Sequence, residues 1–169
     1  MAVGLCNGRL PAELAAAVLA LAGVRAGDVV LDLLPAAGLT AGLAAATGPG
    51  GSVLALCEPG EEAPLGATAT IGAVTDLQAA QLRVGKVVLP APAAAAPGLA
   101  ELLVAVRGVL APGARVTVAA RPNGGALTEG LPAVLAACGL VVVHAEGLAV
   151  AGLPGGRVAL AVGRPAGGS

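Results

Sequence analysis

Two acidic residues stand at the ends of short apolar runs, where their carboxylates could bind a polar ligand. Asp32 lies within the run at 29–34, which continues through a small-residue loop into an alanine-rich segment at 39–46. Glu58 closes the run at 52–58, about 20 residues after Gly38, which is the separation that nucleotide-type sites place between a glycine loop and a ribose-binding carboxylate. Open α/β sheets bind ligands at such strand ends. The pattern therefore predicts a nucleotide-cradling strand, loop and helix.

The rest of the chain alternates strand-like and helix-like segments. Continuous apolar runs favour parallel strands covered on both faces. We predict strands at 29–34, 52–58, 67–74, 86–92 and 113–121, and helices at about 11–22, 39–46, 97–110 and 128–138. Segment 59–66 is too short and too rich in proline for a full crossover helix, and the runs at 140–148 and 156–164 read as a closing antiparallel hairpin.

These segments predict an α/β protein with a Rossmann-like three-layer α/β/α sandwich. The expected sheet has seven strands, mostly parallel, with an antiparallel C-terminal strand. We expect one domain over 1–169, with a frayed tail at 164–169.

Composition limits the partners of the chain. It has no aromatic residue, 11% charged residues and a net charge of −1, with nine basic residues scattered along the sequence. Bases are usually held by aromatic stacking, and phosphates by basic patches, so we expect no direct nucleic-acid binding by the chain alone. Low charge favours a surface covered by protein partners or a larger assembly. Prolines and glycines interrupt the apolar runs, so no membrane span is predicted.

The three cysteines, Cys6, Cys57 and Cys138, are far apart and form no CxxC pair. This spacing predicts no zinc site and no disulfide scaffold, and it favours buried free thiols in an intracellular, reducing compartment such as the cytoplasm or an organelle matrix. We predict no metal site and assign no catalytic residue. His144, the single histidine, could act as a general base beside Glu146, but a structural or surface role is favoured.

Several phrases resemble the class I S-adenosylmethionine-dependent methyltransferases. They are "RAGDVVLDLLPAAGLT" at 25–40, "GPGGSVLALCEP" at 48–59, "KVVLPAP" at 86–92 and "LLVAVRGVLAPGARVTVAARPN" at 102–123. The resemblance implies S-adenosylmethionine as cofactor, with the methionine part held by Asp32 and the loop backbone. It also implies Glu58 on the ribose, with Cys57 as the other candidate to face the pocket. Asp76 or Ala73 would lie near the adenine, and Pro90 at the strand end that faces the methyl donor.

The same resemblance shows departures in the first motif, commonly GxxVLDxGxGxG. Leu34 and Ala36 stand where the first two glycines belong, Gly38 keeps the third, and Pro35 removes one backbone donor. We therefore expect a methyltransferase-like protein with weak or absent activity. The alternative is a pseudoenzyme that serves as a structural or interaction subunit of a larger assembly, including a ribonucleoprotein one. In that case Asp32 would simply cap the following loop or helix.

A narrower resemblance joins the chain to the Sun-family RNA 5-methylcytosine methyltransferases, whose motifs are "LDxCAAPGGKT" and "DAPCSG". The chain has "LDLLPAAGLT" and "LPAPAAA" instead. On this alignment Pro90 replaces the aspartate and Ala93 replaces the nucleophilic cysteine, so no thiol is present there to attack a base.

Overall fold

The computed structural model describes residues 8–9, 12–33, 36–37, 39–57, 65–72, 74–91, 99–120, 127–149 and 157–165. The helices are α1 (Ala12–Ala22), α2 (Leu39–Thr47), α3 (Val74–Ala79), α4 (Leu99–Arg107) and α5 (Leu127–Ala137). The strands are β1 (Gly8–Arg9), β2 (Val29–Asp32), β3 (Ala36–Ala37), β4 (Ser52–Leu56), β5 (Ala69–Ile71), β6 (Val84–Ala91), β7 (Leu110–Ala120), β8 (Leu140–Ala149) and β9 (Arg157–Pro165).

Seven of these strands form one mixed sheet in the order β5-β4-β2-β6-β7-β9-β8. The first five run parallel, β9 runs antiparallel to β7, and β8 pairs antiparallel with β9. β1 and β3 form a separate two-stranded parallel pair. The predicted α/β fold, with a mostly parallel seven-stranded sheet closed by an antiparallel hairpin, is confirmed.

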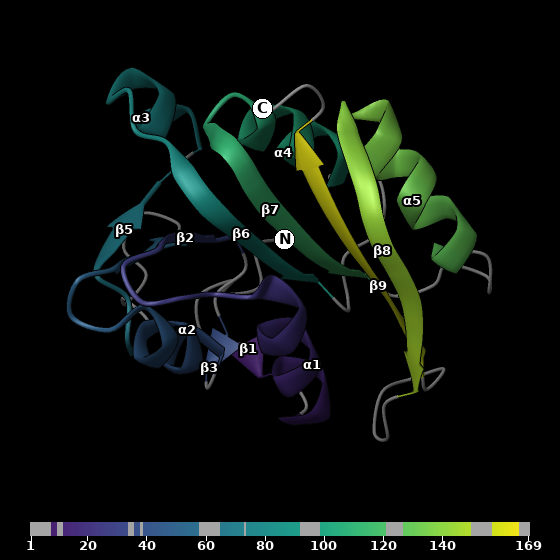
Figure 1. Ribbon diagram of the computed structural model, residues 1–169, viewed down its shortest axis with the longest axis horizontal. Helices are drawn as coiled ribbons and strands as arrows, with labels where there is room; N and C mark the ends of the chain where they lie inside the picture. Colours follow the sequence, from purple (N-terminus) through teal and green to yellow (C-terminus); the bar gives the residue numbers. More distant parts are fainter. Residues whose placement is uncertain are drawn as a thin grey trace.

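Helices cover both faces of the sheet, which gives the three predicted layers (Figure 1). On one face, here called the α1 face, Leu14 and Val18 of α1 and Leu43 of α2 pack on β2, β4, β6, β7 and β9. The opposite face, the α5 face, packs against α3, α4 and α5. Strand side chains alternate between the two cores, so the continuous apolar runs reflect burial on both faces.

The parallel strands define two edges of the sheet. The amino edge holds the first residues of β2, β4, β6 and β7, and the carboxyl edge holds their last residues. Helices α1, α4 and α5 each begin at the carboxyl edge, since each precedes a strand that starts at the amino edge. Among the described residues, no helix combines the length and hydropathy that crossing a bilayer requires.

Three local predictions are wrong. The predicted strand 67–74 is shorter than expected, since β5 spans Ala69–Ile71 and Val74 already begins helix α3, whose Leu77 packs on the α5 face. Predicted helix 97–110 ends at Arg107, and β7 already begins at Leu110. The predicted strand 113–121 also begins earlier, because β7 starts at Leu110 and includes Pro112 and Gly113 in a bulge. Between the pairs Val84↔Leu110 and Lys86↔Arg115, β6 advances two residues and β7 advances five.

The predicted frayed tail is also wrong in part. Arg164 and Pro165 belong to β9, where they pair with Val141 and Leu140 of β8. Pairing of the whole terminal hairpin holds these two residues in the sheet. Residues 166–169 lie outside the described residues. That 1–169 forms one domain stays a prediction.

Candidate functional site

Asp32 is the last residue of β2, at the carboxyl edge in the middle of the sheet. Its register partners are Ala55 of β4 and Val88 of β6, so it has a strand on each side. Its neighbours in sequence, Leu31 and Leu33, pack on the α5 face, so its own side chain lies on the α1 face. The side chain is completely buried, which makes the polar contacts of its carboxylate decisive for its role.

Thr40, the second residue of α2, holds that carboxylate. The Thr40 hydroxyl donates a hydrogen bond of 2.8 Å to Oδ2 of Asp32, and Thr40 is also completely buried. The contact therefore ties the end of β2 to the first turn of α2 across the loop where the cofactor was predicted.

Gly66 supports the first turn of α2 from outside. An added Cβ at this glycine would lie 2.9 Å from the Ala41 Cα and 3.0 Å from the Thr40 carbonyl oxygen. Its φ of +100° is also one that residues with a side chain rarely adopt. The chain can approach the backbone of α2 this closely only through glycine.

The other predicted site residues are partly described. Ala36 lies in β3, paired with Gly8 of β1. Pro90 lies in β6, paired with Ala119, two residues beyond Val88, which is the partner of Asp32. Asp76 lies in the first turn of α3 and is exposed, and its Oδ2 would lie 3.7 Å from a Cβ added at Gly72. Leu34, Pro35, Gly38 and Glu58, together with the alternative Ala73 and with Ala93, lie outside the described residues.

The structure thus places Asp32 and Pro90 on the adjacent strands β2 and β6, toward the carboxyl edge. Sequence reasoning missed Thr40 and Gly66. The signal for Thr40 was a hydroxyl residue at the start of a helix that follows a strand-end aspartate. Gly66 had no comparable signal, because its partner, the first turn of α2, lies more than twenty positions earlier in the chain.

The cysteines correct one prediction. Cys138 is buried and forms no disulfide, as expected. Cys57 is disulfide-bonded, with a partner outside the described residues, so the prediction of a free thiol is wrong for this residue. It is buried with Ala55 and Ala67 beside the end of β4. The inference from free thiols to a reducing compartment loses this support and stays a prediction.

Two further groups can be placed. Nε2 of His144 lies 3.1 Å from Oε2 of Glu146, and both side chains are more than two-fifths exposed on β8. An exposed pair on an edge strand fits the favoured surface role for this histidine. Within the described ranges, no three His, Cys, Asp or Glu side chains gather as ligands for a metal ion.

Known protein structures with a similar architecture identify the type of fold. Similar solved structures include precorrin-8w decarboxylase of Methanobacterium thermoautotrophicum, with 20% identity over 93% of this chain and 92% of the other and a TM-score of 0.64. The fold is that of class I S-adenosylmethionine-dependent methyltransferases. Aeropyrum pernix fibrillarin, solved with natively bound S-adenosylmethionine, shares 18% identity over 88% of this chain and 74% of its own, with a TM-score of 0.62.

A third similar structure is a methyltransferase of Haloferax volcanii in complex with the methyltransferase activator Trm112. It shares 17% identity over 89% of this chain and 88% of its own, with a TM-score of 0.64. No protein-family model and no curated protein sequence matches the chain. At these identities the likeness concerns the methyltransferase fold, and the chemistry of this chain has to be argued from its own residues.

Proposed function

We propose that the chain is a methyltransferase-like protein that binds S-adenosylmethionine and has weak or no methyl-transfer activity. The main support for this proposal is the junction of β2 and α2 at the carboxyl edge. There the buried Asp32 carboxylate accepts a hydrogen bond from Thr40 in the first turn of α2. A loop that holds a cofactor needs a fixed helix start beside it, and the backbone amides of that start favour an anionic group. The junction therefore fits this cofactor.

In this proposal Asp32 is a positioning residue. Its side chain is completely buried, so it acts on a ligand through the orientation of Thr40 and α2. Contacts to the cofactor itself are proposed for the loop at 35–38, including Ala36 and Gly38, for Glu58 on the ribose and for Asp76 near the adenine. The bound cofactor would supply an electrophilic methyl group on its sulfonium sulfur. Methyl transfer requires chiefly in-line positioning of the acceptor, so the lack of an assigned general base does not forbid it.

The second candidate is a pseudoenzyme that serves as a structural or interaction subunit. It is favoured by the same hydrogen bond, since a carboxylate that is buried and engaged by Thr40 also suits a purely structural cap. Leu34 and Ala36 in place of loop glycines point the same way. The complex of a similar methyltransferase with its activator Trm112 supports a protein partner in either case.

Isothermal titration calorimetry of the full chain with S-adenosylmethionine and with its demethylated product separates the two candidates. The first predicts a saturable heat for both ligands. The matched variants are Asp32→Ala, which removes the acceptor of the Thr40 hydrogen bond, and Asp32→Asn, which keeps an oxygen acceptor. No heat up to about millimolar ligand, where binding is worth only about 4 kcal/mol, would reject cofactor binding and leave the subunit role.

A further inference from the structure

Basic residues that are scattered in the sequence gather at the amino edge of the sheet. Eight of the nine basic residues are described, and six of them lie at this edge, whereas Asp28 is the one described acidic residue there. Arg25 and Arg83 precede β2 and β6, and Arg107 ends α4. The set is Arg25, Arg83, Lys86, Arg107, Arg115 and Arg164.

Three of these residues form a row on the α1 face. Lys86 of β6 is the register partner of Arg115 of β7, and both point to the α1 face because Val87 and Val116 pack on the α5 face. Arg164 of β9 follows the partner of Val116, so it comes opposite Arg115 on the same face. Neighbouring strands lie about 4.8 Å apart, so the three cationic residues occupy adjacent positions on three neighbouring strands of the sheet.

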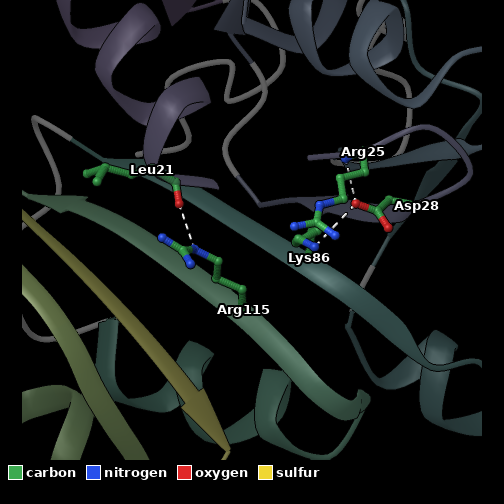
Figure 2. A network of polar contacts seen from close by, with 5 residues as sticks. All are labelled: Leu21, Arg25, Asp28, Lys86 and Arg115. Atoms are coloured by element: carbon green, nitrogen blue, oxygen red, sulfur yellow. Dashed lines mark hydrogen bonds and ion pairs between the residues drawn. The ribbon is translucent and has the colours of Figure 1, made fainter. Parts of the chain in front are cut away.

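Arg25 and Asp28 extend the row at its β2 end. Oδ2 of Asp28 accepts a 2.7 Å hydrogen bond from the Arg25 backbone N–H and lies 3.3 Å from Nζ of Lys86. Figure 2 shows the Arg25 side chain reaching toward Lys86, while Nε of Arg115 donates to the Leu21 carbonyl across 2.7 Å. Asp28 pairs with Lys86, whose side chain is 18% exposed, and the part-buried Arg115 is bonded to Leu21, so Arg25 and Arg164 are the exposed cations of the row. Counted against the single carboxylate of Asp28, the four cations leave an excess of three positive charges.

Among the described residues, acidic groups outnumber basic ones at the opposite edge, where Arg157 begins β9. Asp32 ends β2 there, and Glu13, Glu101 and Glu129 lie in the first turns of α1, α4 and α5, which all begin at the carboxyl edge. Acidic groups favour helix N-termini and basic groups favour C-termini. A net charge of −1 therefore hides two edges of opposite charge, which the sequence alone did not indicate.

We propose that the basic edge, defined as Arg25, Lys86, Arg115 and Arg164, binds the phosphate backbone of a nucleic-acid duplex independently of base sequence. Guanidinium groups match phosphate oxygens in geometry, and three of the four residues are arginines. The cations are spread along an edge rather than converging on one point, which suits repeated phosphates. The chain has no aromatic side chain for stacking, so backbone contact with a duplex is favoured over a single strand.

An acidic protein surface fits less well. Protein interfaces are centred on large apolar or aromatic anchors and are depleted of charge at the core. Among the described residues, two exposed large apolar side chains lie beside the row on β8: Val141, which pairs with Arg164, and Val143, two residues further along the strand. This proposal is independent of cofactor binding, and it revises the expectation from net charge that the chain alone does not bind nucleic acid.

The test is fluorescence anisotropy of a labelled RNA duplex of about 20 base pairs, titrated with the full chain at several salt concentrations. We expect a Kd of about 10⁻⁴ to 10⁻⁵ M at low salt and a log–log salt slope of about −3, as for three neutralised phosphates. A DNA duplex should bind similarly, the corresponding single strand more weakly, and polyglutamate of equal charge should not bind.

Arg25→Glu and Arg164→Glu are the informative variants, because both side chains are exposed and neither side chain forms a hydrogen bond or ion pair with another described residue; Arg25 bonds to Asp28 through its backbone N–H. Each should weaken duplex binding at least about fivefold and lower the salt slope by about one. Arg157→Glu, the same charge change at the other end of β9, should change affinity less than about twofold. Circular dichroism checks that all three variants fold.

The proposal is overturned if the duplex does not bind at low salt with about 100 µM protein, or if Arg157→Glu weakens binding as much as Arg164→Glu does. Binding of polyglutamate in preference to the duplex would overturn it in favour of an acidic protein partner.

Discussion

The hydroxyl of Thr40 donates to Oδ2 of Asp32 across 2.8 Å, and both side chains are completely buried. The two residues come from different elements, the end of β2 and the start of α2, and are eight positions apart. Their contact fixes the junction where the sequence predicts a cofactor loop. The stability of the junction and any ligand affinity should therefore depend on the same hydrogen bond.

Replacing Thr40 with valine keeps the shape of the side chain and removes the donor to Asp32. Because the carboxylate is buried, the loss should lower the free energy of unfolding by about 1–3 kcal/mol. Urea denaturation followed by circular dichroism measures this change. Thr70→Val, on an exposed position of β5, is the matched control and should change stability by less than about 0.5 kcal/mol. Equal stability of the two variants would contradict a structural role for the Thr40–Asp32 contact.

Asparagine at position 32 separates a positioning role from direct ligand contact. Asp32→Asn keeps an oxygen that can accept the Thr40 hydrogen bond, whereas Asp32→Ala does not. If Asp32 acts by positioning, the Asn variant should keep S-adenosylmethionine affinity within about threefold, and the Ala variant should lose about tenfold or more. Calorimetry gives both values. An equal, large loss in both variants would instead indicate that the negative charge itself contacts the ligand.

Gly66 should tolerate no side chain. Gly66→Ala places a Cβ 2.9 Å from the Ala41 Cα at a φ of +100°, so we expect a destabilisation of more than about 1 kcal/mol. Gly50→Ala is the control, since a Cβ there meets nothing within 4 Å and its φ lies outside the left-handed region. Chemical denaturation compares the two. A Gly66→Ala protein as stable as the control would show that the segment at 65–72 does not hold α2 in this way.

Burial raises the pKa of the Cys138 thiol above its ordinary value of 9.0. The folded thiol therefore resists ionisation, and at pH 8 it should react with an aromatic disulfide reagent only as fast as the protein unfolds. In the unfolded chain the thiol ionises from about pH 9. Its contribution to stability is thus complete below that pH and is lost as the pH rises toward the raised folded value.

Cys138→Ala should abolish that slow reaction and flatten the alkaline fall in the free energy of unfolding. Rapid labelling of Cys138 in the native protein at pH 8 would contradict its burial beneath α5 and β8.

The sheet was predictable because the apolar composition of its strands indicates that they are buried. Strands β2 and β7 bury apolar residues on both faces, Leu31 and Val116 on the α5 face and Val30 and Ala119 on the α1 face, and only a parallel strand between two helix layers needs that. The first motif and the terminal hairpin then determined the order of the elements. Asp32 could be placed at the carboxyl edge for the same reason, since it follows the buried residues Val30 and Leu31.

Features that depend on distant pairing were not predictable. Among the described side chains of helix α3 only Leu77 is buried, so they show no helical period. The bulge in β7 contains Pro112 and Gly113, a residue pair that by itself predicts a turn and the end of an element. Lys86, Arg115 and Arg164 are separated by 29 and 49 positions (115 − 86 and 164 − 115), and only the strand order β6-β7-β9 makes them neighbours. Net charge conceals such clustering.

The most direct test of the central claim is calorimetric titration of the full chain with S-adenosylmethionine, with the product as second ligand. We predict saturable binding of both ligands, weakened about tenfold or more by Asp32→Ala and retained by Asp32→Asn. The absence of any heat up to about millimolar ligand, in protein shown to be folded, would contradict the claim and leave a methyltransferase fold without its cofactor.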